Sequence, residues 1–310
     1  MDTNPQTNPR HTGIASFFRT PISADITEAE IGIIGVPFDG GVTHRAGARH
    51  GPRAVREQST LLRTINSSTG ATPFANSRVR DLGDCWIANP YELTSAHKEI
   101  ETYYTNIHAD GIIPLTIGGD HSISLPILRA IAKDGPVGMI HIDAHCDTGD
   151  DYMGSRFHHG SPFRRAVEEG LLNPKRVIQI GIRGTTNDKD MWSFSLSSGM
   201  HIITMDDFLV GGIDYVVNTA KAIVGNGPTY LSFDIDSLDP SEAPGTGTPE
   251  AGGIQVREAL RMLRMFRGIK FIGGDLVEVS PPFDNGTITS FNAASILFEM
   301  LCLIEEARHI

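Results

Sequence analysis

The chain has 310 residues, 40% of them hydrophobic, and a formal net charge of −11 at neutral pH. This length allows one or two domains, and the apolar content is enough for a large core. An acidic chain without basic runs argues against nucleic acid and against an anionic membrane surface as partners, because both need clustered lysine and arginine.

Cysteine usage and the N-terminus indicate the compartment. Three widely spaced cysteines, Cys85, Cys146 and Cys302, are typical of a reducing environment and not of a disulfide framework. The N-terminus MDTNPQTNPRHTG is polar and proline-rich, unlike a signal peptide, and no uninterrupted apolar run reaches membrane-spanning length. We therefore expect a cytoplasmic protein with a flexible N-terminal arm over residues 1–12 and a single catalytic domain over residues 13–310.

Six short apolar runs, each ending in or running into Gly, Asp or His, punctuate the chain. They lie at residues 31–41, 112–121, 137–147, 177–184, 229–236 and 269–282. Their apolar character is nearly continuous and does not alternate, which is typical of strands buried on both faces. The runs therefore predict a parallel sheet covered by helices.

Helical patterns separate these runs. Leu125, Leu128 and Ile131 recur at helical spacing, and residues 213–224 repeat the pattern before Gly225. Residues 291–304 are apolar nearly all round, which predicts a buried C-terminal helix. Strand and helix in alternation predict an α/β fold. The segments 64–79 and 184–196 are the most loop-like by composition.

Polar clusters follow several of the apolar runs. These clusters are Asp120-His121, Asp143-x-His145-x-Asp147 and Asp234-x-Asp236. Parallel sheets bind ligands beyond the carboxyl ends of their strands, so these side chains should share one crevice. Strand alternation puts residues 143, 145 and 147 on one face and Cys146 on the other. Carboxylates mixed with imidazoles suit divalent metals, and six ligands suit a pair of ions. The competing interpretation is a set of Asp turn or helix caps, with Asp120 as the cap of the following helix.

Longer motifs resemble a known family. IGGDHS (117–122), DAHCD (143–147) and SFDIDSLDPSEAPGTGTPEAGG (232–253) resemble the signature blocks of the ureohydrolases, which include arginases, agmatinases and guanidino-acid amidinohydrolases. GVTHRAGARHGPRAVR (41–56) and GGDLVEVSPPFD (273–284) are similar to the agmatinase branch. The resemblance extends from about residue 32 to the C-terminus. It implies a three-layer α/β/α arginase-like fold with a central, mainly parallel sheet, assembled as a homotrimer or homohexamer.

The resemblance also implies a binuclear manganese centre, two Mn²⁺ per subunit, with Ni²⁺ as the alternative. One ion would be held by His121, Asp143, Asp147 and Asp234. The other would be held by Asp143, His145, Asp234 and Asp236. Asp143 and Asp234 would then bridge the two ions.

The implied reaction is hydrolysis of a guanidino group to urea and an amine. A metal pair activates water for this attack. Asp147 would also bond the nucleophile, and His159, which directly precedes glycine in FHHGSPF, would protonate the leaving amine. Glu278 would pair with the guanidinium, and Thr246 would contact the guanidino group. Taken without the resemblance, His159 is a polar loop residue and Glu278 is a strand-end carboxylate.

The loop at residues 149–158 is expected to read the substrate tail. Tyr152 lies in it, and Asp150 or Asp151 offers a partner for the ammonium of agmatine. Arg156 offers a partner for the carboxylate of 4-guanidinobutyrate. The loop is similar to those of amidinohydrolases that act on guanidino acids, which favours a guanidino acid. The alternatives are agmatine, another guanidine or biguanide, formimino-group hydrolysis, single-zinc deacetylation, and a partner subunit of such an enzyme.

Overall fold

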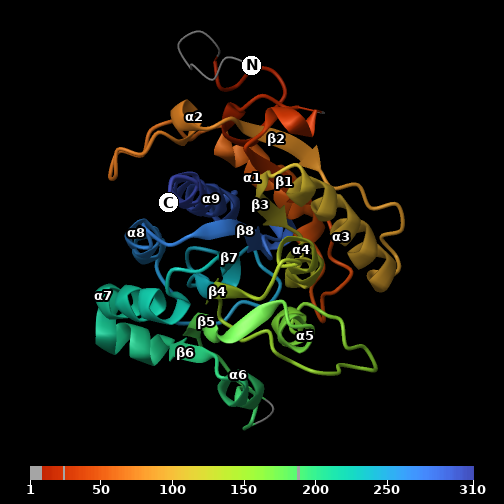
Figure 1. Cartoon of the computed structure of the whole chain (residues 1–310), viewed down its shortest axis with the longest axis vertical. Helices are drawn as coiled ribbons and strands as arrows, with labels where there is room; N and C mark the ends of the chain where they lie inside the picture. Colours follow the sequence, from red (N-terminus) through yellow and green to blue (C-terminus); the bar gives the residue numbers. More distant parts are fainter. Residues whose placement is uncertain (1–8, 24, 187–188) are drawn as a thin grey trace.

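A computed structural model describes residues 9–23, 25–186 and 189–310. Eight strands form one sheet in the order β2-β1-β3-β8-β7-β4-β5-β6, and every pair of neighbours is parallel (Figure 1). The strands are β1 (Ile31–Val36), β2 (Val79–Asp84), β3 (Ile113–Gly118), β4 (Val137–Ile142), β5 (Leu172–Ile182), β6 (His201–Thr204), β7 (Thr229–Asp234) and β8 (Phe271–Val277). The fold is thus the predicted α/β architecture with a parallel sheet.

Five of the six predicted runs contain a strand, and the run at 177–184 overlaps β5, which already begins at Leu172. The two strands that the sequence did not predict are the edges of the sheet. β2 reads VRDLGD and β6 reads HIIT, so neither has the continuous apolar character that a doubly covered strand shows. One predicted strand is too long, because β4 ends at Ile142 and Asp147 has a φ of 50°. Strict alternation therefore does not extend through residues 143–147.

Helices cover both faces of the sheet, with one group on each side (Figure 1). One group contains α1 (Gly51–Ser59), α7 (Met205–Val224), α8 (Val256–Met265) and α9 (Ile288–Ala307), whose apolar residues share one core cluster. The other contains α3 (Leu93–Ala109), α4 (Ser124–Ile131) and α5 (Pro162–Glu168), which share a second cluster. Two short helices, α2 (Pro73–Asn76) and α6 (Ser193–Ser198), lie in the segments predicted to be loops. This three-layer arrangement confirms the predicted fold class.

Helix α9 is the buried C-terminal helix that the sequence predicts. It is long and apolar enough to cross a membrane, but 78% of that stretch is buried inside the protein. Its side chains pack against β8 and against α1 and α8, so its apolar composition is explained by the core.

The predicted domain boundaries remain a proposal. Residues 1–8 of the predicted arm lie outside the described part of the chain, and Arg10 Nη1 donates to the Leu61 carbonyl at 2.8 Å. Strands drawn from residues 31 to 277 share one sheet, which supports a single domain over residues 13–310.

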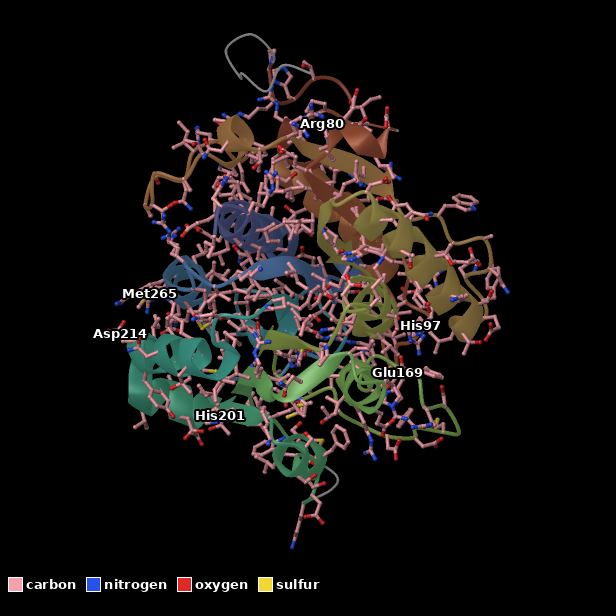
Figure 2. The ribbon with its side chains drawn as sticks, viewed as in Figure 1. Arg80, His97, Glu169, His201, Asp214 and Met265 are labelled. Carbon is pink, nitrogen blue, oxygen red and sulfur yellow. The ribbon has the colours of Figure 1, made fainter. Side chains whose placement is uncertain are left out.

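The 3-10 turn after β3 is clamped from the α3 side of the sheet. His97, labelled in Figure 2, lies on α3 and is buried. Its Nε2 lies 3.1 Å from Oγ of Ser122, the residue after His121. Burial lowers the pKa of His97 to about 4, so the ring is neutral at physiological pH. Asp120 caps this turn by accepting from Ser122 N at 2.9 Å, as the cap interpretation predicts.

Candidate metal centre

The four central strands β3, β8, β7 and β4 bring the predicted site residues together. His121 follows β3, Asp143 follows β4, Asp234 ends β7 and Glu278 follows β8. Because these strands are parallel neighbours, their carboxyl ends meet at one edge of the sheet. The site is therefore assembled from segments far apart in sequence.

The first cluster surrounds the His121 ring. Its Nδ1 lies 3.2 Å from Asp143 Oδ2, 2.9 Å from Asp147 Oδ2 and 3.1 Å from Asp234 Oδ2. The ring and Asp143 are fully buried, and Nδ1 has no hydrogen-bond partner of good geometry among the described residues. Three carboxylates around one imidazole nitrogen carry more negative charge than a single imidazolium could neutralise. The arrangement fits a divalent cation at their centre.

Hydrogen bonds orient the lone pair of His121 Nδ1 toward these carboxylates. Ser232 Oγ lies 2.6 Å from Asp275 Oδ1 and, because the carboxylate only accepts, the serine donates. Ser232 Oγ then accepts from His121 Nε2 at 2.8 Å. The proton on Nε2 leaves Nδ1 free to bind a metal, which is how outer residues orient metal-binding histidines.

The second cluster joins the first through Asp143. His145 Nδ1 lies 3.4 Å from Asp143 Oδ1 and 3.2 Å from Asp236 Oδ2. Each oxygen of Asp143 thus faces a different histidine, as a carboxylate that bridges two ions would. Asp234 belongs to the first cluster, and its Oδ1 accepts from Asp236 N at 2.8 Å. Its role as a second bridging ligand stays a prediction.

The electrostatics of these carboxylates call for positive charge. Burial, together with the charges of Asp236 and Asp143, raises the pKa of Asp234 well above its usual value. Burial likewise raises the pKa of Asp236. Buried carboxylates this close together cannot all be ionised unless cations neutralise them. The residues present therefore fit a pair of divalent metal ions.

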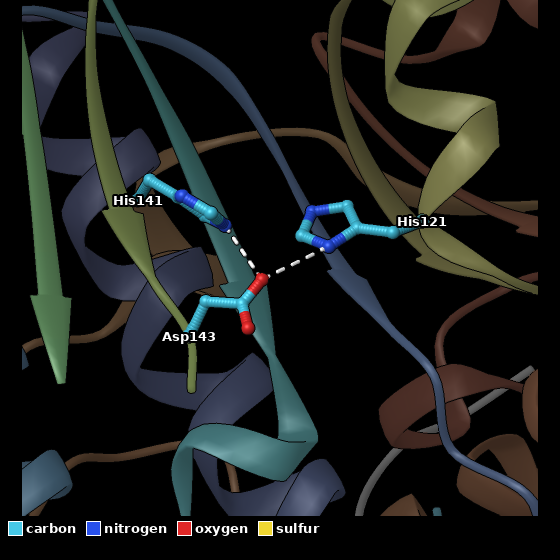
Figure 3. Close-up of side chains that lie close together, drawn as sticks. All are labelled: His121, His141 and Asp143. Carbon is cyan, nitrogen blue, oxygen red and sulfur yellow. Dashed lines mark hydrogen bonds and ion pairs between the residues drawn. The ribbon is translucent and has the colours of Figure 1, made fainter. Parts of the chain in front are cut away.

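His141 also contacts this centre, although no sequence motif assigned it a role. Figure 3 shows Asp143 between His141 and His121, with His141 Nε2 2.7 Å from the Oδ2 atom of Asp143. Gln179, the register partner of His141 on β5, places its Nε2 3.0 Å from His141 Nδ1. The amide donates to Nδ1, so Nε2 carries the proton and donates to Asp143. The signal in the sequence was the spacing, since His141 lies on β4 two residues before Asp143, which directly follows that strand.

Glu278 and His159 form a pair beside the clusters. His159 Nδ1 lies 2.8 Å from Glu278 Oε1, which also accepts from His121 N at 2.9 Å. Glu278 has a φ of 64°, a backbone conformation that costs roughly 1–3 kcal/mol and is concentrated at functional sites. Glu278 Oε2 and Thr246 Oγ1 are buried and lack hydrogen-bond partners in the described structure. Among the described residues, neither atom is used by another side chain or by the backbone.

A cavity of about 230 Å³ opens onto this region. It is lined by Thr43, Ala144, His145, Cys146, Asp147, Thr148, Gly149, His159, Gly160, Arg183, Met191, Trp192, Asp234, Asp236 and Thr248. Cys146 belongs to neither cluster, and burial raises its pKa to about 12, so the thiol is inert. Met191 and Trp192 supply apolar wall from the loop after β5, a contribution that no sequence motif indicated.

The structure does not bring the three loop residues predicted to read the substrate tail to this cavity. Arg156 Nη2 lies 2.7 Å from Glu168 Oε2, and Asp150 Oδ1 lies 2.6 Å from Arg165 Nη2. Tyr152 is 44% exposed. Both charged side chains instead form ion pairs with α5, Arg156 with Glu168 and Asp150 with Arg165.

Arg183 is the arginine that lines the cavity among the described residues. Its three guanidinium nitrogens all donate to backbone carbonyls, including those of Asp236 at 2.8 Å and Glu250 at 2.7 Å. It therefore fastens the 236–251 segment to the end of β5, and its N–H groups are occupied.

The match to known proteins extends over nearly the whole chain. The model of the arginase family matches residues 29–302. Guanidinopropionase of Pseudomonas aeruginosa is 48% identical, and the match covers 96% of this chain and 94% of the relative. Guanidinobutyrase of the same organism is 44% identical over 96% of this chain and 94% of its own. Chicken agmatinase is 43% identical over 95% of this chain and 87% of its own.

Solved structures share the architecture. Proclavaminate amidino hydrolase from Streptomyces clavuligerus superposes with a TM-score of 0.93 at 37% identity, covering 97% of this chain and 100% of that one. Trypanosoma cruzi formiminoglutamase with Mn²⁺ superposes with a TM-score of 0.81 at 28% identity, covering 91% of this chain and 95% of that one. With this match in sequence and in three dimensions, the chain belongs to the arginase family.

Proposed function

We propose that this protein hydrolyses the guanidino group of a small guanidino compound to urea and an amine. One observation carries the proposal: two His–Asp clusters share Asp143, and the His159–Glu278 pair stands beside them. Such a site combines a place for two cations with a protonated group and an unpaired carboxylate oxygen. These are the requirements for attacking a poor electrophile and then releasing a basic amine.

The proposed metal is manganese, with nickel as the alternative. His121, Asp143, Asp147 and Asp234 would hold one ion, and Asp143, His145, Asp234 and Asp236 the other. Support comes from the mixed imidazole and carboxylate donors, and from the similar formiminoglutamase, whose crystal structure is of the protein with Mn²⁺. When bound, the ions activate water as a nucleophile at neutral pH.

The chain's own residues would bind the guanidinium and move the proton. Glu278 Oε2 and Thr246 Oγ1, both buried and unpaired among the described residues, would accept N–H groups of the planar guanidinium and fix its orientation. Burial disfavours the charged form of His159, but the charge and hydrogen bond of Glu278 outweigh it and raise the pKa to about 9. His159 would therefore be protonated at neutral pH and serve as the general acid for the leaving amine.

The proposed substrate is a short guanidino acid such as 4-guanidinobutyrate. Support comes from relatives named guanidinopropionase and guanidinobutyrase. Agmatine is the competing substrate, because a relative at 43% identity is named agmatinase. The group that would bind the substrate carboxylate is not Arg183, whose N–H groups are occupied. Arg156 remains a hypothesis that a mutation can test.

Assembly and location also remain proposals. We propose a homo-oligomer, trimer or hexamer, in the cytoplasm. The cysteines Cys85, Cys146 and Cys302 are free and buried, as expected in a reducing compartment.

The test is urea release by protein loaded with Mn²⁺ or with Ni²⁺, using 3-guanidinopropionate, 4-guanidinobutyrate, agmatine and arginine at equal concentration. We expect the highest kcat/KM with one of the two guanidino acids and no urea after chelation of the metal. Faster hydrolysis of agmatine would overturn the substrate proposal and leave the reaction standing. Absence of urea from all four compounds with both metals would contradict the proposed reaction.

A further inference from the structure

The proton-carrying ring of His159 has a neighbour on its far side, and that neighbour is Thr43. Thr43 Oγ1 lies 2.8 Å from His159 Nε2, and the Thr43 backbone N lies 3.2 Å from the same atom. The other ring nitrogen is occupied by Glu278. Both hydrogen-bonding positions of the ring are thus defined, one by an acceptor and the other by a threonine.

The hydroxyl and the backbone N–H of Thr43 can pair with different protonation states of the His159 ring. Glu278 only accepts, so His159 Nδ1 carries a proton in either state of the ring. A backbone N–H only donates, so it can serve Nε2 when the ring is neutral. When Nε2 is protonated it needs an acceptor, and the threonine hydroxyl is the acceptor within reach. One residue therefore provides a partner for each protonation state.

The exposure of the two residues indicates the direction in which a proton could move. His159 is buried, whereas Thr43 is exposed, and both line the same cavity. The hydroxyl that contacts the buried ring thus belongs to a residue that lines the space a substrate would fill. The segment that carries it is held in place, because Gly41 N donates to Asp120 Oδ2 at 2.7 Å and the Gly41 carbonyl accepts from His159 N at 2.8 Å.

We propose that Thr43 relays the proton of His159 into the cavity and holds the ring in both of its protonation states. The inference rests on the proposed function. In the step, the His159 Nε2–H bond breaks as a new O–H bond forms on Thr43 Oγ1, whose own proton passes to the nitrogen of the departing amine. The electron pair of the C–N bond leaves with the amine. The remaining protonated urea gives one proton to water, and His159 is left neutral.

The test compares Thr43→Val, which removes the hydroxyl and keeps the shape and the backbone amide, with Thr43→Ser, which keeps the hydroxyl. We expect Thr43→Val to lower kcat by about tenfold or more, because a positioned proton donor is worth on the order of 10²–10⁴ in rate. KM should stay within about twofold and metal content should not change, because the amide, ring and ligands remain. Thr43→Ser should restore kcat to within about threefold.

A double mutant with His159→Asn isolates the route of the effect. If Thr43 acts through His159, the double mutant should be no slower than His159→Asn alone. Wild-type kcat in Thr43→Val, equal losses in the Val and Ser variants, loss of metal, or multiplied losses in the double mutant would each overturn the relay. Absence of urea from the wild-type enzyme is a separate result that would contradict the proposed function itself, and with it this inference.

Discussion

The strand-end clusters and the 149–158 loop are both rich in charge, but they use it in opposite ways. In the clusters, His121 Nδ1 faces three carboxylates and has no hydrogen-bond partner among the described residues. In the loop, Arg156 and Asp150 find partners of opposite sign in α5. The clusters are fully buried at Asp143 and Asp236, whereas both loop residues are about half exposed. Buried carboxylates without a neutralising partner are typical of binding sites.

The contrast identifies which carboxylates should matter. A buried carboxylate aimed at other carboxylates persists only if function requires it, because its desolvation costs several kcal/mol. An exposed ion pair contributes roughly 0–1 kcal/mol and is easily replaced. Mutations in the two regions should therefore differ in their effect on activity.

The largest loss of activity is expected from the isosteric replacement of Asp234 in the first cluster. Asp234→Asn removes a charge and one oxygen ligand, so we expect loss of metal and a fall in kcat/KM of about 10³-fold or more, the scale of removing an essential group in the transition state. Asp150→Asn is the matched control in the loop, and it should retain activity within about threefold. Elemental analysis and urea assays measure both. Similar losses in the two variants would erase the distinction between the regions.

The next largest effect is expected on the pH dependence of the hydrolysis rate. His159 has a pKa raised to about 9, since Glu278 outweighs the effect of burial, and it must be protonated to act as an acid. The rate should therefore be level around neutral pH and fall as pH rises through about 9. Glu278→Gln removes the charge that favours the imidazolium, so the alkaline limb should move to lower pH. His159→Asn should lower kcat by roughly 10²-fold and abolish the limb. A pH–rate profile checks the sign; a limb that moves to higher pH in Glu278→Gln would contradict it.

Sequence patterns predicted the sheet well because its central strands are buried on both faces. The edge strands β2 and β6 were not predicted, because polar positions interrupt their apolar character. Among site residues, the motifs assembled His121, Asp143 and Asp234 at one edge, because each closely follows a strand end or ends a strand. The structure brings them together as the motifs imply.

What sequence reasoning missed depends on contacts between distant segments. Thr43 meets His159 across 116 positions, and Gln179 meets His141 only because β4 and β5 are neighbours in register. No local period or spacing encodes such pairs. The contact of Arg156 with Glu168 on the following helix was not predicted either, and the role of Arg156 stays a prediction.

A smaller effect, on metal affinity, should follow from removing the hydrogen bonds that orient Asp143. Gln179→Leu removes the donor that sets the His141 tautomer, so Asp143 loses an orienting hydrogen bond while every proposed ligand remains. We expect metal affinity to fall by about tenfold, the low end for residues that orient ligands. Titration against a competing chelator measures it. Thr116→Val is the control, since it removes a buried hydroxyl bonded to Tyr104. It should cost stability without changing metal affinity; equal metal affinities in the two variants would show that Gln179 merely packs.

The smallest effect is expected at Arg156, where the loop hypothesis can be tested directly. Its side chain is 58% exposed and pairs with Glu168 at 2.7 Å, and it does not line the cavity. Arg156→Ala should therefore change kcat/KM by less than about threefold, and equally for 4-guanidinobutyrate and agmatine, because a rim ion pair contributes little. Trp192→Ala is the sharper probe, since it opens an apolar wall of the cavity and should raise KM by about tenfold, the cost of roughly 1.4 kcal/mol of lost contact. A loss confined to the guanidino acid in Arg156→Ala would mean that the loop must rearrange on binding, and would return Arg156 to the role of carboxylate anchor.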